Sequence, residues 1–177
     1  MRRSATVMEM PKVISSEKTG RKYRRRSVRG VPLFMDEGII SDMANHADIG
    51  YAEDKEVLGL ISGRVYRDEE GEYSIASGTA TARLDATGVS VRFDPDCLED
   101  LFASIDESGG DAVIGWYHSH PGFGCYLSDV DIRTHSDIFG KGTGFAVVLD
   151  PSDGTLMVFT VEDGEPKAAQ MVVSEDG

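Results

Sequence analysis

Two histidines separated by a single residue are the first feature of this sequence that can do chemistry. His118 and His120 follow a short apolar run at 112–117 that predicts a buried strand. Residues i and i+2 of a strand project from the same face, so both imidazoles can bind one metal ion. Pro121 ends the strand just beyond them, which leaves the pair at an open rim. Alone, a His-x-His pair is weak evidence, because purely structural histidines show the same spacing.

The segment Ser128-Asp-Val-Asp131 allows two interpretations. Ser-x-x-Asp before an apolar residue is typical of a helix capping box, with Ser128 as the N-cap and Asp131 at the third helical position. Residues three apart on a helix also share a face. Asp131 can therefore supply an oxygen ligand while Ser128 directs its hydroxyl at a neighbouring oxyanion. Taken alone, the spacing favours the capping box.

Two nitrogen ligands and one oxygen ligand leave one position of a tetrahedral zinc ion open, as in catalytic zinc sites. Zinc lowers the pKa of bound water towards about 7 and polarises a carbonyl group. Hydrolysis then needs a carboxylate that takes a proton from this water and gives it to the leaving amine. Spacing alone does not choose among the 31 acidic residues. Glu56 stands out modestly because it is the first residue of an apolar strand and does not lie in an acidic run. It can equally have no chemical role and merely cap the end of that strand.

The elements that must position these residues predict an α/β (α+β) domain with a mixed central β-sheet flanked by helices. The pattern at 94–107 is the strongest, because Asp94-Pro95 is a good helix start and the apolar residues that follow recur along one face. Other helices are expected at about 33–47 and from Ser128. A turn is expected at 68–71, and strands are expected at 56–63, 73–83, 89–93, 112–117, 144–150, 155–161 and 168–173.

The charge distribution divides the chain in two. Residues 1–30 carry ten basic and two acidic residues, a net charge of +8, whereas residues 31–177 carry eight basic and 29 acidic residues, a net charge of −21. The first segment is expected to be a basic, disordered tail, although it can instead dock on an acidic partner, on nucleic acid or on the acidic body. The body itself should repel nucleic acid and favour basic partners.

Length, hydropathy and cysteine content exclude several classes of protein. No run approaches the roughly 18 apolar residues of a membrane span, and no apolar stretch follows the N-terminal arginines, so no secretory signal is expected. Cys97 and Cys125 do not make a disulfide framework. The sequence therefore predicts a soluble, cytoplasmic protein that does not bind membranes.

The sequence from His118 to Asp131 resembles, without a gap, the His-x-His-Pro-x6-Ser-x-x-Asp signature of JAMM (MPN+) metalloproteases. Glu56-Val-Leu-Gly59 resembles the upstream Glu-x-x-Gly element of the same family. Trp116-Tyr117 and the segment 87–91 are most similar to the deubiquitinase of the proteasome lid, with the signalosome isopeptidase a close second. The resemblance covers about residues 33–165.

The resemblance implies a role for each residue of these motifs. His118, His120 and Asp131 would bind one catalytic Zn²⁺ ion, Glu56 would be the general acid/base, and Ser128 would steady the tetrahedral oxyanion. The family cleaves the isopeptide or peptide bond after the C-terminal Gly-Gly of ubiquitin or a ubiquitin-like protein. That extended tail is expected to pair, as an added strand, with Thr87, Gly88, Val89, Ser90 and Val91.

The resemblance also implies a cytidine-deaminase-like MPN fold for a catalytic domain at 31–177. Conjugates of ubiquitin or a ubiquitin-like protein are the expected substrates, and the proteasome is a candidate partner. The chain ends soon after its last expected strand, without the long C-terminal helices of the lid enzyme, which favours a stand-alone archaeal enzyme. Two alternatives stay open: a non-catalytic MPN scaffold, and a JAMM peptidase that acts on small sulfur-carrier-like proteins, which also end in Gly-Gly.

The remaining residues of interest are expected to be structural. Cys125 lies close to the histidines and can be a nucleophile or a fourth ligand, but a packing role is favoured. His46 and His135 are expected to be ordinary helix residues. Trp116 should point away from Tyr117 and serve as a core anchor.

Overall fold

The computed structural model of the chain describes residues 7–9, 32–68, 71–81, 105 and 111–174. Along the chain the elements are β1 (Val7–Glu9), β2 (Leu33–Asp36), α2 (Glu37–Ala52), β3 (Leu58–Asp68), β4 (Gly71–Ala80), β5 (Ala112–Ser119), α4 (Asp129–Phe139), β6 (Phe145–Asp150), β7 (Thr155–Glu162), β8 (Glu165–Ala168) and β9 (Met171–Ser174). No helix in these ranges is long and apolar enough to cross a membrane.

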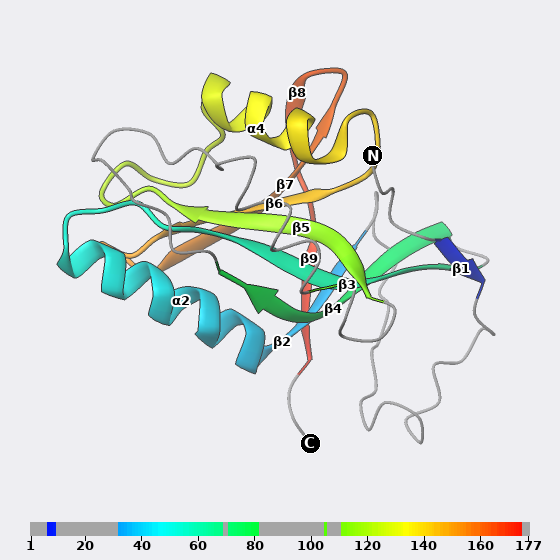
Figure 1. Cartoon of the computed structure of the whole chain (residues 1–177), viewed down its shortest axis with the longest axis horizontal. Helices are drawn as coiled ribbons and strands as arrows, with labels where there is room; N and C mark the ends of the chain where they lie inside the picture. The colour runs from blue at the N-terminus through cyan, green and yellow to red at the C-terminus, as the bar shows by residue number, and fades with distance from the viewer. Residues whose placement is uncertain (1–6, 10–31, 69–70, 82–104, 106–110, 175–177) are drawn as a thin grey trace.

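One nine-stranded mixed sheet organises the described residues, with α2 and α4 on opposite sides of it (Figure 1). The strand order is β8-β7-β6-β5-β3-β4-β2-β9, and β1 pairs with β3 beside this path. β5 lies inside the sheet, antiparallel to β3 and parallel to β6. The prediction of a mixed central sheet flanked by helices is thereby confirmed.

The first helix begins later than the sequence predicts. Residues 33–36 form the strand β2, which runs parallel to both β4 and β9, and Leu33, Phe34 and Met35 are buried there. A strand that is buried on both faces has no polar face, so its sequence pattern does not differ from that of a buried helix. Asp36 then caps α2 by accepting a hydrogen bond from the Ile39 amide at 2.9 Å.

Two other boundaries differ from the expected ones. β3 begins at Leu58, so Glu56 precedes the strand instead of opening it. The single strand expected at 168–173 is two strands, β8 and β9, with Ala169 and Gln170 between them. Within the segment 1–30, residues 7–9 form β1, which runs parallel to β3. The expected strand at 89–93 and the expected helix at 94–107, apart from Ile105, lie outside the described residues.

Two apolar clusters fill the two faces of the sheet. The cluster beneath α2 includes Ile114 and Tyr117 of β5, whereas the cluster beneath α4 includes Val113 and Trp116. Trp116 is 1% exposed, as expected of a core anchor. Because side chains alternate along a strand, His118 emerges on the same side as Trp116, towards α4.

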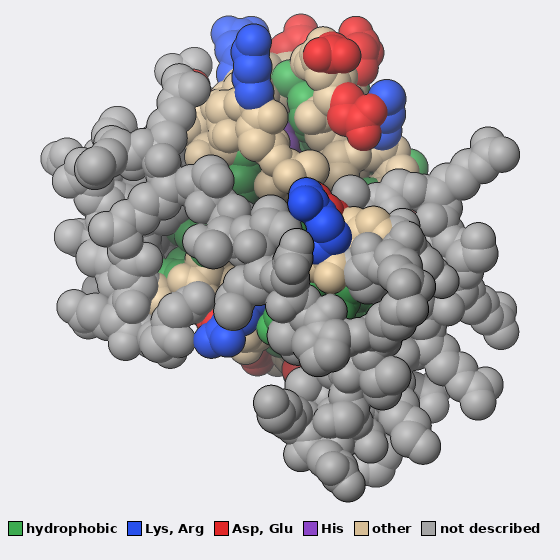
Figure 2. All heavy atoms as spheres, turned by 90° about the vertical axis from the view of Figure 1, so that its right-hand side faces the viewer, with side chains coloured by type: hydrophobic (Ala, Val, Ile, Leu, Met, Phe, Trp, Pro, Cys, Tyr) green, Lys and Arg blue, Asp and Glu red, His purple; other side chains and the backbone are tan. Residues whose placement is uncertain are grey.

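The end of the molecule at which α4 and β8 lie carries acidic and basic side chains close together (Figure 2). Lys167 of β8 forms an ion pair with Glu162 of β7, and both side chains are more than half exposed. Exposed pairs of this kind contribute about 1 kcal/mol or less. The position of β5 and α4 is therefore set by the buried apolar clusters and not by these surface charges.

Candidate active site

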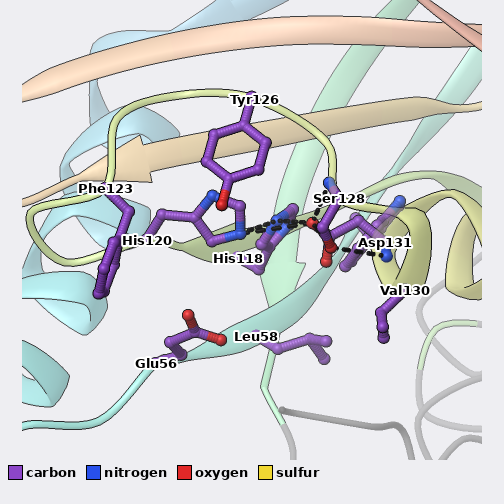
Figure 3. Close-up of a pocket in the computed structure, with 10 residues that line it drawn as sticks. Glu56, Leu58, His118, His120, Phe123, Tyr126, Ser128, Val130 and Asp131 are labelled. Atoms are coloured by element: carbon purple, nitrogen blue, oxygen red, sulfur yellow. Dashed lines mark hydrogen bonds and ion pairs between the residues drawn. The ribbon is translucent and has the colours of Figure 1, made fainter. Parts of the chain in front are cut away.

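His118 and His120, at the end of β5, meet Asp131 in the first turn of α4 (Figure 3). The two Nε2 atoms are 3.2 Å apart, and Asp131 Oδ2 lies 3.4 Å from His118 Nε2 and 3.3 Å from His120 Nε2. Ligand atoms about 2.0–2.1 Å from a tetrahedral zinc ion are separated from one another by roughly 3.4 Å. The three atoms are therefore spaced as one tetrahedral zinc ion requires.

Ring packing orients both imidazoles. Trp116 stacks on His118, with the ring centroids 4.5 Å apart and the planes 12° from parallel, and Tyr126 lies 4.8 Å from the ring of His120. The Trp116 indole N–H donates to His135 Nδ1 at 3.1 Å. Metal-binding histidines usually donate their second ring N–H to a partner. The Nδ1 atoms of His118 and His120 have no such partner among the described residues, so the aromatic contacts take over that orienting role.

The three side chains shift one another's protonation. Burial lowers the pKa of His118, and the neighbouring Asp131 opposes this only in part. Burial also lowers the pKa of His120, but the hydrogen bond and charge of Asp131 outweigh it and leave the pKa raised. Burial raises the pKa of Asp131, yet the hydrogen bonds from the two imidazoles hold it well below its usual range. The site therefore presents an ionised carboxylate, the form in which a carboxylate binds a cation.

The helix start at Ser128 is a capping box, as its spacing suggests. Ser128 Oγ accepts a hydrogen bond from the Asp131 amide at 3.2 Å, and Asp131 Oδ2 accepts from the Ser128 amide at 2.7 Å. The Ser128 hydroxyl also donates to the same Oδ2 at 2.6 Å. The capping and metal-binding interpretations are therefore compatible, because the oxygen that receives the capping bonds is also the one beside the imidazoles.

Glu56 lies in the same cavity as the three candidate ligands. The cavity has a volume of about 270 Å³ and is lined by Glu56, Leu58, Trp116, His118, His120, Phe123, Tyr126, Ser128, Val130 and Asp131. In Figure 3 the Glu56 carboxylate points towards the two imidazoles from the side opposite Tyr126. Burial raises the pKa of Glu56, the charge of His120 lowers it, and that of Asp131 raises it further, with a raised pKa as the net result.

Ser119 is a residue near the site that sequence analysis missed. It is fully buried, and its hydroxyl accepts a hydrogen bond from the Val57 amide at 2.9 Å, while its own amide donates to the Val57 carbonyl at 3.0 Å. The residue between the two histidines thereby fixes the backbone next to Glu56. The sequence offered one signal for Ser119, its position between the two histidines. Side chains alternate along a strand, so Ser119 must face away from the candidate ligands.

Other candidate residues do not enter the cavity. Cys125 is half-buried, and its Sγ contacts the Val148 carbonyl at 3.3 Å, which supports the packing role. His46 of α2 has its Nδ1 2.8 Å from the Tyr117 hydroxyl, on the other face of the sheet. His135 is more than an ordinary helix residue, because it is buried and bonded to Trp116. The expected tail-binding segment 87–91 and Cys97 lie outside the described residues.

Comparisons with known proteins agree with the motifs. A family model described as JAB1/Mov34/MPN/PAD-1 ubiquitin protease matches residues 33–139. The ubiquitin carboxyl-terminal hydrolase RPN11 of Saccharomyces cerevisiae is 33% identical over 159 residues, which cover 85% of this chain and 47% of that protein. The 26S proteasome regulatory subunit rpn11 of Schizosaccharomyces pombe is 48% identical over 101 residues, 54% of this chain and 31% of that protein.

One further relative and one solved structure extend this comparison. The COP9 signalosome complex subunit 5 of Oryza sativa subsp. japonica is 33% identical over 103 residues, 55% of this chain and 27% of that protein. The chain thus spans less than half the length of these three curated relatives. A solution structure of a Desulfitobacterium hafniense protein matches with a TM-score of 0.62 and 21% identity, covering 81% of this chain and 93% of that one, which is a likeness of fold.

Proposed function

Because the chain belongs to the JAB1/Mov34/MPN/PAD-1 family, we propose that it is a zinc-dependent isopeptidase. Its substrates would be proteins conjugated to ubiquitin or a ubiquitin-like modifier, cleaved after the C-terminal Gly-Gly of the modifier. The mixed sheet between two helices agrees with the MPN fold that the sequence resemblance implied. One observation carries the proposal: three candidate ligand atoms lie at tetrahedral spacing in the cavity that Glu56 also lines.

The proposed zinc site uses His118 Nε2, His120 Nε2 and Asp131 Oδ2. Held by these three side chains, a zinc ion would supply Lewis-acid chemistry, polarising the scissile carbonyl and lowering the pKa of water. The protein prepares the ligands in advance, since Trp116 and Tyr126 hold the imidazoles and the capping box holds the carboxylate. Such pre-ordering lowers the conformational cost of binding the ion.

Glu56 is the proposed proton carrier. Its raised pKa lies closer to neutral pH than that of an ordinary glutamate. A general base with such a pKa can both accept a proton from water and return it to the leaving amine. Ser128 is the proposed donor to the oxyanion of the tetrahedral intermediate, and it lies at the helix N-terminus, where the dipole favours negative charge. Its hydroxyl now donates to Asp131, so this role requires the hydroxyl to turn towards substrate.

The substrate class is proposed from the relatives. RPN11 of Saccharomyces cerevisiae is named a ubiquitin carboxyl-terminal hydrolase, and two other relatives are named as subunits of the 26S proteasome and of the COP9 signalosome. A ubiquitin-like modifier is therefore the proposed substrate of this chain, and association with the proteasome is a further proposal.

Cleavage of matched conjugates tests this function. A ubiquitin-like protein is joined to its partner either head-to-tail or through a lysine side chain, and each conjugate is incubated with purified, chelator-treated and zinc-restored enzyme. Cleavage after Gly-Gly that is lost on chelation and recovered with zinc is the expected result. A chain that binds one zinc ion and cleaves neither conjugate would contradict the isopeptidase assignment, and a chain that binds no zinc would favour the scaffold.

A further inference from the structure

The loop that follows His120 is attached to the sheet by a carboxylate outside the cavity. Asp150 is the last residue of β6, is 3% exposed, and ends its strand beside the end of β5, because the two strands are parallel. Asp150 Oδ1 accepts from the Gly122 amide at 2.9 Å, and Oδ2 accepts from the Gly124 amide at 2.7 Å. Both bonds reach across from β6 to the loop at 121–126.

The two glycines are needed for backbone angle and not for space. Gly122 and Gly124 have φ of +78° and +79°, in the left-handed region that side chains rarely adopt. A Cβ at either position would meet no atom within 4 Å. This backbone conformation points both amides at one carboxylate. The two glycines and Asp150 therefore favour the same conformation of the loop.

The other contacts of Asp150 form a local turn. The Ser152 amide donates to Oδ1 at 3.0 Å, and the Ser152 hydroxyl donates to the same oxygen at 2.6 Å. Together with the loop amides, these donors hold the pKa of Asp150 below its usual range. The two oxygens have different partners: Oδ1 accepts from both the turn and Gly122, whereas among the described residues Oδ2 accepts from Gly124 alone.

The loop held in this way forms part of the cavity wall. Phe123 lies between the two anchored glycines and is 72% exposed, and Tyr126 is 49% exposed, yet both line the cavity. Figure 3 shows the two rings on the loop, on either side of His120. An exposed aromatic ring has few contacts of its own to hold it, so its position depends on the backbone that carries it.

We propose that Asp150 is a positioning residue that holds the 121–126 loop so that Phe123 and Tyr126 form a preorganised wall for substrate. This inference rests on the proposed function, because the substrate is the conjugate cleaved there. Loss of the anchor lowers the fraction of molecules in the binding arrangement, which weakens apparent substrate binding by the same factor. His118, Asp131 and Glu56 lie on other segments, so the chemical step of the zinc-loaded enzyme should change little. His120 directly precedes the loop and is packed by Tyr126, so zinc binding should weaken together with the wall.

The test uses Asp150→Asn in the full chain. The amide oxygen can keep the turn and the Gly122 bond, while the amide nitrogen replaces Oδ2 and cannot accept from Gly124. We expect KM to rise about tenfold, the scale of one lost hydrogen bond to a charged group, with kcat within about threefold of the original. KM and kcat are therefore compared at saturating zinc, with zinc occupancy checked by the fluorescence of Trp116, the single tryptophan. An unchanged KM at full zinc occupancy, or a loss that lies in kcat, overturns the proposal.

Two further variants and one activity-independent readout complete the design. Ser152→Ala removes only the hydroxyl donor of the turn and should leave KM within about twofold. Gly124→Ala strains the same anchor from the loop side. The double variant Asp150→Asn/Gly124→Ala should therefore raise KM by less than the product of the two single effects. Amide hydrogen exchange of residues 122–126 should accelerate in Asp150→Asn while β5 and α2 stay protected. This exchange supports the anchor even if no conjugate is cleaved; uniform acceleration along the chain overturns it.

Discussion

Gly59 lies so close to the ring of Tyr117 that a Cβ at residue 59 would be 2.4 Å from Tyr117 Cε1. The two residues are direct partners across β3 and β5. The Tyr117 hydroxyl in turn lies 2.8 Å from His46 Nδ1, which links β5 to α2. The glycine of the Glu-x-x-Gly element therefore makes room for a large aromatic side chain immediately before His118.

Replacement of this glycine should destabilise the fold. Gly59→Ala places a methyl group inside contact distance of a fully buried ring, and overpacking of this kind costs about 1–3 kcal/mol. Urea denaturation measures the change in the free energy of unfolding. Gly78→Ala in β4 is the matched control, because its Cβ would meet only Ser62 Oγ, at 3.5 Å. Equal losses in the two variants would disprove the steric explanation.

Glu56→Gln should abolish most turnover while zinc stays bound. The amide cannot accept a proton from water, so kcat should fall about 100-fold or more. Since burial raises the pKa of Glu56 and the base must be ionised, activity should fall as the pH drops through a value above the ordinary 4.5. A pH profile of kcat/KM tests this direction. Glu53→Gln, at an exposed glutamate paired with Lys55, should behave as the original protein does.

Ser128→Ala separates the oxyanion role from the capping role. Loss of the N-cap should lower stability by about 1 kcal/mol, and loss of an oxyanion donor should lower kcat about 100-fold at unchanged zinc content. Ser128→Asp retains a capping oxygen but lacks the hydroxyl donor. If Ser128→Asp restores both stability and kcat, Ser128 acts only as a helix cap.

Ser119→Ala should affect the chemical step through Glu56. The variant leaves the buried Val57 amide without its hydroxyl acceptor, which costs about 1–3 kcal/mol and loosens the backbone beside Glu56. At temperatures where the protein stays folded, kcat should fall at least fivefold while KM changes little. Ser119→Thr keeps the hydroxyl and should recover part of kcat. A rise in KM alone would contradict this positioning role.

His135 should make the fold sensitive to mild acid. Burial lowers its pKa from 6.5 to about 4. Between these pH values the unfolded chain binds a proton that the folded chain does not, so stability is lost as the pH falls from 6.5 to 4, by up to about 3 kcal/mol. Protonation would also remove the acceptor for the Trp116 indole. His135→Gln should flatten the pH dependence of unfolding in this window; an unchanged slope would exclude His135 as its source.

Sequence patterns predicted those elements whose limits carry a local marker, such as a turn, a proline break or a helix cap. β5 and the start of α4 have clear signals, because apolar residues, a proline break and a capping box mark them. β2 did not, since its three apolar residues are buried between two other strands and show no period. The choice of helix for Leu33–Asp36 failed because no turn or break separates this short buried run from α2, and such a run fits a strand and a helix equally well.

Long-range hydrogen bonds explain what the motifs left out of the candidate site. The candidate ligands His118, His120 and Asp131 lie close together in sequence, so a local motif reveals them. The hydrogen bonds of Ser119 with Val57 and of Asp150 with Gly124 join residues far apart in sequence, and no local motif marks them. Neither residue type is unusual in its local context. Only the register between β5, β3 and β6 brings these groups together.

The parallel pairing of β1 with β3 has a consequence for the order in which the chain folds. Val7 pairs with Val65, and the pairing ends at Glu9 with Arg67. A contact between positions so far apart must close a long loop, and the entropy of that closure delays it relative to the neighbouring β3–β4 hairpin. β1 should therefore pair after the β3–β4 hairpin has formed, and until then the edge of β3 at residues 65–67 that faces β1 stays unpaired. Truncated forms that begin after residue 9, in which this edge has no partner strand, would be more prone to self-association than the full chain.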